Sequence, residues 1–126
     1  MSQVLLVDDN PLQLSVREAI LRKAGFQVCV ATTAESALAM LRAFPDRIGA
    51  VVTDHLMPGA SGSELVRKIR AFRPRLPVIV LSGLPDAESE YRELDVIFRT
   101  KPLPPPELIE LLHSSLEQDD QQSGAA

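Results

Sequence analysis

The sequence is poor in cysteine and has no long apolar run. Its single cysteine, Cys29, cannot support a disulfide framework, which indicates a reduced, intracellular protein. The apolar run from Val4 to Val7 is broken by two aspartates, and no later run has membrane-spanning length. Residues 1–3 also lack the basic region of a secretion signal. We therefore expect a cytoplasmic protein with no membrane partner.

Positive charge is also scarce and scattered. The chain has 13 Lys and Arg against 17 Asp and Glu, for a net charge of -4 at pH 7, and only 3 of the basic residues are lysines. A surface that binds the phosphate backbone of nucleic acid needs clustered basic residues, which no stretch supplies. No recognition-helix module is present either. We expect no direct contact with nucleic acid.

The length of 126 residues, of which 45% are hydrophobic, predicts one globular domain with a single core. We assign this domain to residues 1–117. Residues 118–126 are polar or small and have no periodicity, which predicts a disordered C-terminal tail or the stub of a linker.

Five short apolar runs predict buried strands at residues 4–7, 28–30, 48–52, 78–81 and 96–98. Amphipathic helices are predicted between them, and this alternation is typical of an α/β protein with a parallel sheet covered on both faces. The predicted helix starts are Asn10 with Pro11, a capping box of Thr32 and Glu35, a second capping box of Ser61 and Glu64, and the prolines before Leu108.

The apolar faces of the predicted helices differ in strength. The residues expected to face the core are Leu12, Val16, Ile20 and Ala24 in the first helix and Leu108, Leu111, Leu112 and Leu116 in the last. Between residues 82 and 101 only Ala87, Tyr91 and Leu94 suggest such a face. The fourth helix should therefore be short or irregular.

The residues that directly follow the apolar runs carry most of the chemistry. They are Asp8, Asp9, Asp54, Ser82, Thr100, Lys101 and Pro102. Ligands of doubly wound sheets bind at the carboxyl ends of the strands, so three carboxylates, a hydroxyl and an ammonium group should share one crevice. A divalent cation would relieve the repulsion between the carboxylates, and an all-oxygen site suits Mg²⁺. With this metal, one carboxylate becomes a competent phosphoryl acceptor.

Each of these residues has a simpler explanation when it is considered alone. Asp8 and Asp9 could cap a helix, and Asp54 could be a turn residue. Ser82 could belong to an ordinary loop, and Lys101 could be a solvated cation. Their joint occurrence at four strand ends favours the shared site.

Four motifs in this order resemble the receiver domain of two-component response regulators. The motifs are Val7-Asp8-Asp9, Asp54-His55-Leu56-Met57-Pro58-Gly59, Leu81-Ser82-Gly83 and Lys101-Pro102. The resemblance extends from about Val4 to Leu116. It implies a flavodoxin-like, doubly wound five-stranded parallel sheet in the strand order 2-1-3-4-5.

The resemblance also implies how the acidic residues act. Asp54 would be the phosphoacceptor. Asp9, Asp54 and the backbone carbonyl of Leu56 would hold Mg²⁺ directly, and Asp8 would act through metal-bound water.

The same resemblance implies a switch. Ser82 and Lys101 would contact the phosphoryl oxygens, and Phe98 would turn inward when Ser82 moves. A histidine kinase or a phosphotransfer protein would donate the phosphoryl group, and a downstream protein would recognise the changed surface. The chain would then catalyse only its own phosphotransfer and dephosphorylation.

Two departures from the family pattern stand out. The stretch from residue 82 to residue 101 is shorter than is usual, which argues against the family's common mode of dimerisation. Leu56 and Leu84 occupy positions where polar residues often orient the attacking water, which predicts slow autodephosphorylation. Whether the chain is a stand-alone regulator or the receiver of a larger protein stays open at this point.

Three alternative functions have distinct requirements. A Mg²⁺-dependent phosphohydrolase with Asp54 as its nucleophile needs a general acid or base, and His55 is the only nearby candidate. A flavin carrier on the same fold needs a phosphate-binding loop where Asp8 and Asp9 would repel the phosphate. A docking module that is never phosphorylated would not need the full acceptor set.

Overall fold

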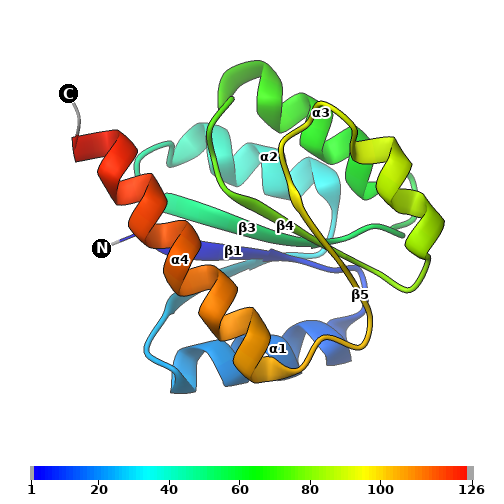
Figure 1. The fold of residues 1–126 in the computed structure, drawn as a ribbon, viewed down its shortest axis with the longest axis horizontal. Helices are drawn as coiled ribbons and strands as arrows, with labels where there is room; N and C mark the ends of the chain where they lie inside the picture. The colour runs from blue at the N-terminus through cyan, green and yellow to red at the C-terminus, as the bar shows by residue number, and fades with distance from the viewer. Residues whose placement is uncertain (1, 125–126) are drawn as a thin grey trace.

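The computed structural model describes residues 2–124 and contains one five-stranded parallel sheet (Figure 1). Its order is β2-β1-β3-β4-β5, which confirms the predicted doubly wound topology. Each predicted apolar run lies within an observed strand, except that the last strand begins one residue later than its run. The strands are β1 (Gln3–Val7), β2 (Gln27–Ala31), β3 (Ile48–Asp54), β4 (Val78–Ser82) and β5 (Ile97–Thr100).

Helices cover both faces of the sheet (Figure 1). α1 (Pro11–Lys23) and α4 (Pro105–Gly124) lie on one face, and α2 (Ala34–Ala43) and α3 (Gly62–Phe72) lie on the other. The segment between β4 and β5 forms only a short 3-10 helix, η1 (Pro85–Tyr91), in which Ala87 and Tyr91 are buried. The predicted short, irregular fourth helix is therefore confirmed.

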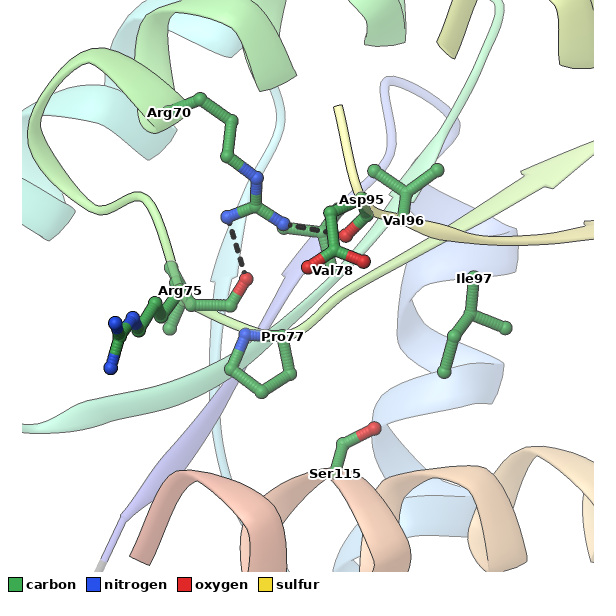
Figure 2. A pocket seen from close by; sticks show the side chains of 9 residues that line it. Arg70, Arg75, Pro77, Val78, Asp95, Val96, Ile97 and Ser115 are labelled. Carbon is green, nitrogen blue, oxygen red and sulfur yellow. Dashed lines mark hydrogen bonds between the residues drawn. The ribbon is translucent and has the colours of Figure 1, made fainter. Parts of the chain in front are cut away.

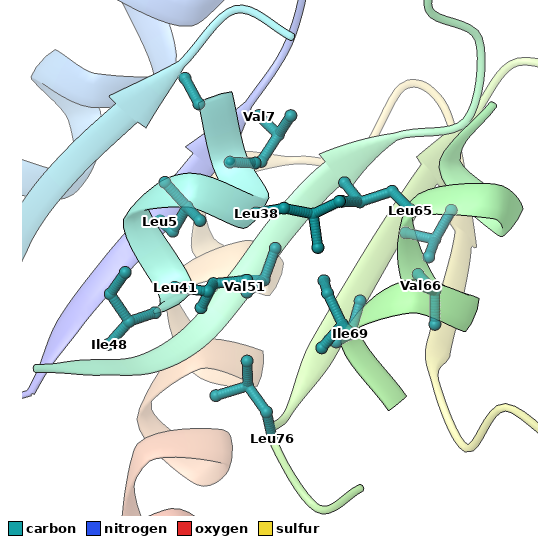
Figure 3. Close-up of a cluster of buried hydrophobic side chains, with 14 of the residues drawn as sticks. Leu5, Val7, Leu38, Leu41, Ile48, Val51, Leu65, Val66, Ile69 and Leu76 are labelled. Carbon is teal, nitrogen blue, oxygen red and sulfur yellow. The ribbon is translucent and has the colours of Figure 1, made fainter. Parts of the chain in front are cut away.

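Hydrophobic clusters fill the space on either side of the sheet. Figure 3 shows the cluster under α2 and α3, to which Leu41 and Leu65 of these helices and Val51 of β3 belong. The cluster on the other face includes Leu21 from α1 and Leu112 from α4. Every residue of β3 is buried, as expected for a central strand covered on both faces.

The cap of α2 differs from the prediction, whereas the caps of α1 and α3 are the predicted residues. The α2 cap is Thr33, whose hydroxyl oxygen accepts a hydrogen bond from the Ser36 amide at 3.0 Å. The predicted box of Thr32 and Glu35 is therefore wrong by one residue. Two threonines stand side by side in the sequence, and the extended backbone of Thr33 places its hydroxyl over the first turn.

The inner face of α1 differs in part from the predicted one: Ala24 packs against the core as predicted, but Leu12 and Val16 do not. Leu12 and Val16 are 74% and 52% exposed, whereas Leu14 and Leu21 are buried. The last two residues are two helical turns apart, so they project from the same side. The predicted residues and the buried residues both have helical periodicity. The packing of α1 against the sheet decides which of the two sets faces the core. As a result, α1 presents an apolar stripe on its outer side.

α4 continues to Gly124, so residues 118–124 are helical where the sequence predicts a disordered tail. No proline interrupts this stretch, and three of its seven residues are glutamine, a good helix former, so the helix continues beyond its buried part. Residues 125–126 lie outside the described residues.

Among the helices that the structure describes, none is both long and apolar enough to cross a membrane.

Arg70 of α3 holds the loops at the end of the sheet where β4 and β5 begin. Burial lowers the pKa of its guanidinium. Figure 2 shows this side chain beside a cavity of about 260 Å³. The guanidinium donates hydrogen bonds to the carbonyl oxygens of Arg73, Leu76, Leu94 and Asp95. This cavity lies at the opposite end of the strands from the site that the sequence predicts.

Candidate functional site

The carboxyl ends of the central strands are tied together by main-chain hydrogen bonds. The amide of His55 donates to the carbonyl oxygen of Leu81 at 3.0 Å, and the amide of Lys101 donates to that of Ser82 at 2.7 Å. These bonds hold the residues that follow β3 and β5 beside the end of β4. The polar residues that the sequence places after different strands are thereby brought to one edge of the sheet.

Asp8, Asp9 and Asp54 form an acidic cluster at this edge. One carboxylate oxygen from each residue lies within 4.8 Å of the other two. Asp8 and Asp54 are only 1% and 4% exposed, whereas Asp9 is exposed. Oδ1 of Asp8 accepts a hydrogen bond from the amide of Asn10 at 2.9 Å. The cluster thus reaches from the interior to the surface.

Two cations neutralise part of this negative charge. Nζ of Lys101 lies 2.9 Å from Oδ1 of Asp54. The sequence predicts this proximity, because the two residues lie at the carboxyl ends of strands in one parallel sheet. Nη1 of Arg17 lies 3.2 Å from Oδ2 of Asp8 and 3.6 Å from Oδ1 of Asp54. Both buried carboxylates therefore have a positive partner.

Arg17 is a site residue that the sequence analysis misses. It lies three residues after Leu14 and four residues before Leu21, so all three project from the same side of α1. An arginine on the inner side of an amphipathic helix is the signal that could have identified it. Because Leu12 and Val16 were expected to face the core, Arg17 was not placed on the inner side of α1.

Burial, and after it the neighbouring Asp8 carboxyl, raise the pKa of Asp54, which is about 6. Lys101 and Arg17 lower this pKa and so limit the increase. Above that pH, Asp54 is a carboxylate and can act as a nucleophile. Among the residues that the structure describes, none makes a well-formed hydrogen bond to its buried Oδ1 atom, and Lys101 contacts this atom as an ion pair.

The acidic cluster fits a magnesium ion through its donor atoms. Mg²⁺ prefers oxygen ligands and is usually held by one or two carboxylates together with waters. Asp8, Asp9 and Asp54 supply such oxygens, and Oδ1 of Asp54 is a buried acceptor without a hydrogen bond. These residues could hold Mg²⁺, which would add positive charge beside a phosphoryl group. The backbone carbonyl of Leu56 stays a predicted further ligand.

Ser82 and Phe98, the two predicted switch residues, are both buried. The Ser82 hydroxyl accepts a hydrogen bond from the amide of Leu84 at 2.9 Å and donates one to the carbonyl oxygen of Leu84 at 3.1 Å. The Phe98 ring faces Tyr91, with 5.7 Å between the ring centroids. In this structure the hydroxyl contacts the loop before η1, and the aromatic ring faces the core.

His55 points away from the acidic cluster and contacts η1. Its Nδ1 atom lies 2.6 Å from the Tyr91 hydroxyl, and its Nε2 atom lies 3.3 Å from Oε2 of Glu90. Burial raises the pKa of Tyr91. Adjacent residues of an extended chain project to opposite sides, which explains why His55 and Asp54 have separate surroundings. His55 therefore links the acceptor strand to η1.

Gly62, the first residue of α3, allows this helix to approach the acceptor strand closely. Its amide donates to the carbonyl oxygen of His55 at 2.7 Å. A Cβ atom on Gly62 would lie 2.7 Å from the carbonyl oxygen of Asp54 and 2.5 Å from the Tyr91 hydroxyl. Only glycine fits at this position without moving its neighbours.

An apolar groove of about 530 Å³ borders the acidic cluster. Its apolar lining includes Leu12, Val16 and Ile20 from α1 and Pro102, Leu103 and Pro105 from the segment after β5. Arg17 and Lys101, the two cations beside Asp54, also line it. We call this feature the α1 groove. Exposed apolar surface next to a charged site is typical of a protein-binding face.

Comparison with known sequences gives one consistent result. Residues 4–113 match the response regulator receiver domain. The chain is 29% identical over 120 residues to the transcriptional regulatory protein GlrR of Escherichia coli, and the match covers 93% of this chain and 27% of that protein. It is 33% identical over 120 residues to the C4-dicarboxylate transport transcriptional regulatory protein DctD of Pseudomonas aeruginosa, covering 92% and 25%. The chain thus spans less than a third of these relatives.

Solved structures agree with this result. A response regulator receiver protein from Pseudomonas putida is 35% identical, with a TM-score of 0.82 and coverage of 90% of this chain and 96% of that chain. A response regulator receiver domain protein from Clostridium thermocellum has a TM-score of 0.89, with coverage of 97% and 99%. Its identity of 23% supports the likeness in fold alone.

We predict that Asp54→Asn stabilises the protein in metal-free buffer at pH 7.5. Because the carboxyl pKa rises from 3.8 to about 6 on folding, its contribution to stability is present below the lower value and lost as the pH passes the higher one. Asparagine removes this loss, so the variant should gain about 1–3 kcal/mol at pH 7.5 and much less at pH 4. Urea unfolding measures both differences. The same stability difference at the two pH values would contradict the electrostatic explanation.

Proposed function

The chain belongs to the response regulator receiver domain family, and on this premise we propose that Asp54 accepts a phosphoryl group in a two-component system. The observation that carries this proposal is the surroundings of Oδ1 of Asp54. This atom is buried, lies 2.9 Å from Nζ of Lys101 and belongs to a cluster with Asp8 and Asp9 that fits Mg²⁺. Phosphoryl transfer to a carboxylate needs this combination of a nucleophile and nearby positive charge.

In the proposed reaction a carboxylate oxygen of Asp54 attacks the phosphorus of a phosphohistidine on the donor protein. A P–O bond forms and the P–N bond breaks, and the electron pair leaves with the imidazole nitrogen, which takes a proton from solvent. The Lys101 ammonium balances charge on the phosphoryl oxygens. Asp8, Asp9 and Asp54 would hold Mg²⁺, which would supply further positive charge beside the phosphoryl oxygens. Attack of water on phosphorus later breaks the acyl phosphate and restores Asp54.

A phosphohydrolase is the weaker alternative. Repeated turnover of phosphate esters needs a general acid or base beside the nucleophile. His55 is the candidate that the sequence offers, but its two ring nitrogens contact Tyr91 and Glu90. The proposed chemistry is therefore limited to the phosphoryl group that Asp54 itself carries.

The proposed output is a change of surface around β4, η1 and β5. Phosphoryl oxygens on Asp54 would attract the Ser82 hydroxyl away from its present contacts with Leu84. Phe98 packs on Tyr91, which is the last residue of η1, so rearrangement near Phe98 would reach that surface. Because η1 is a short 3-10 helix, we propose that this surface does not form the family's common dimer.

The proposed donor is a histidine kinase or a phosphotransfer protein, and the proposed setting is the cytoplasm. The relatives GlrR and DctD are named as transcriptional regulatory proteins, and the chain covers only 27% and 25% of their lengths. We propose that any role of this chain in transcription proceeds through a protein contact and not through direct binding of nucleic acid.

The α1 groove is the proposed docking face for the phosphoryl donor. Its lining includes Arg17 and Lys101, which both contact Asp54, so the groove and the acceptor site are continuous. A donor protein seated on Leu12 and Val16 would bring its phosphohistidine to the acidic cluster. Exposed apolar side chains at this place favour a protein donor over a small molecule.

Incubation with acetyl phosphate and Mg²⁺ should add one phosphoryl group to the wild type and none to Asp54→Asn. The amide of asparagine is not a phosphoryl nucleophile, whereas the rest of the site is unchanged. Intact-mass spectrometry measures the adduct. An equal adduct on both proteins, or none on the wild type, would contradict the proposed function.

Leu56→Asn and Leu84→Glu should each speed the decay of the phosphorylated protein. Both leucines are exposed, at 63% and 49%, and their apolar side chains disfavour an ordered water near the phosphoryl group. We expect an increase of about tenfold, which corresponds to about 1.4 kcal/mol in the barrier. The loss of the mass adduct with time measures the rate. Decay at the wild-type rate in both variants would show that these positions do not limit the attack of water.

Leu12→Asp should slow phosphoryl transfer from a histidine kinase that phosphorylates the wild type, by about tenfold or more. The change places a charge in the proposed docking face, and an aspartate in the first turn of α1 is compatible with the helix. Phosphorylation by acetyl phosphate should be unchanged. The control is Phe44→Asp, at an exposed residue after α2 outside the groove. Equal slowing by both variants, or none by Leu12→Asp, would contradict this docking face.

A further inference from the structure

Arg17 is the one charged side chain at the acceptor site whose role the proposed reaction leaves open. Its side chain is 18% exposed, so most of it lies inside the protein. Nη1 donates a hydrogen bond to Oδ2 of Asp8 at 3.2 Å and lies 3.6 Å from Oδ1 of Asp54. Both carboxylates belong to the cluster that could hold Mg²⁺. The guanidinium thus contacts two of the groups that a metal ion would use.

The charge of the cluster explains why a second cation is present. Asp8 and Asp54 are almost fully buried and close together, and their mutual repulsion disfavours the state in which both are ionised. Lys101 contacts only Asp54, at one of its oxygens. Arg17 is the cation that contacts Asp8 as well and thereby compensates both buried carboxylates. The metal-free fold therefore contains its own neutralising group.

A guanidinium and a divalent cation compete for these carboxylates. They carry charges of the same sign, and both need the oxygens of Asp8 and Asp54. The arginine side chain is long and flexible, and Arg17 lines the α1 groove, which offers it space outside the cluster. Movement of Arg17 into this groove would free the oxygens of Asp8 and Asp54 for Mg²⁺.

We propose that Arg17 is a resident counter-ion of the acidic cluster, which Mg²⁺ must displace. The inference rests on the proposed function, because it concerns the magnesium site of that same acceptor. Two consequences follow. Arg17 lowers the affinity of the site for Mg²⁺, because part of the binding free energy is used to break its two ion pairs. It also stabilises the metal-free protein, so that folding depends less on the metal.

The test compares the wild type with Arg17→Gln and with a control, Lys23→Gln. The control removes the same charge from an exposed residue at the end of the same helix. Isothermal titration with Mg²⁺ should show about tenfold tighter binding by Arg17→Gln, which equals about 1.4 kcal/mol. In EDTA the same variant should unfold at a lower urea concentration than the wild type. Lys23→Gln should match the wild type in both measurements.

The outcomes separate this inference from the proposed function. Mg²⁺ binding by the wild type with equal or weaker binding by Arg17→Gln would overturn the inference and leave the magnesium site in place. Absence of Mg²⁺ binding in every protein would overturn both. Slower phosphorylation of Arg17→Gln by acetyl phosphate at saturating Mg²⁺ would also overturn the inference, since it would make Arg17 a ligand of the phosphoryl group.

A second measurement needs no metal. In EDTA, the stability lost through Arg17→Gln should be smaller when Asp8 has already been changed to Asn, because the main partner of the guanidinium is then neutral. A double-mutant cycle by urea unfolding gives this coupling. No coupling between the two positions would show that the 3.2 Å contact has no energetic role and would overturn the proposal.

Discussion

Two buried carboxylates that lie close together at the edge of a parallel sheet are the constraint on which this structure depends. Asp8 and Asp54 repel each other and are shielded from water, so the fold must bring positive charge to them. Lys101, which follows β5, contacts Asp54, and Arg17 of α1 contacts Asp8. Arg17 projects from the same side of α1 as Leu14 and Leu21, so the rotation of α1 that buries these leucines also places Arg17 beside the carboxylates. The same rotation leaves an apolar stripe on the outside, which becomes one wall of the α1 groove.

The constraint also gives the acceptor its chemical character. Burial raises the pKa of Asp54 to about 6, which is still below neutral pH, so the side chain is ionised there although its charge is only partly compensated. This is a suitable state for a nucleophile that takes up a phosphoryl group when more positive charge is supplied. On the other side of the strand, His55 contacts Tyr91, and Tyr91 contacts Phe98. The acceptor strand is therefore connected by direct contacts to the surface that we propose as the output.

The sequence predicts the layout of the fold and most of the site because both follow from local patterns. Five apolar runs define the strands, and parallel strands bring their carboxyl ends together, which places Asp8, Asp54, Ser82 and Lys101 at one edge. The inner face of α1 could not be read in this way, because two sets of apolar residues had helical spacing and only tertiary packing distinguishes them. Arg17 was missed for the same reason. The cap of α2 and the helical residues 118–124 depend on backbone geometry that spacing rules do not fix.

The central claim is that Asp54 is a phosphoryl acceptor whose charge is balanced by Lys101 and by Mg²⁺. A crystal structure of the chain with Mg²⁺ and beryllium fluoride, which mimics a phosphoryl group on a carboxylate, tests it most directly. The account predicts beryllium bonded to an oxygen of Asp54, fluorines in contact with Lys101 and Ser82, and a metal ion held by the acidic cluster. Beryllium fluoride bound elsewhere, or a bound adduct without contact to Lys101, would contradict it.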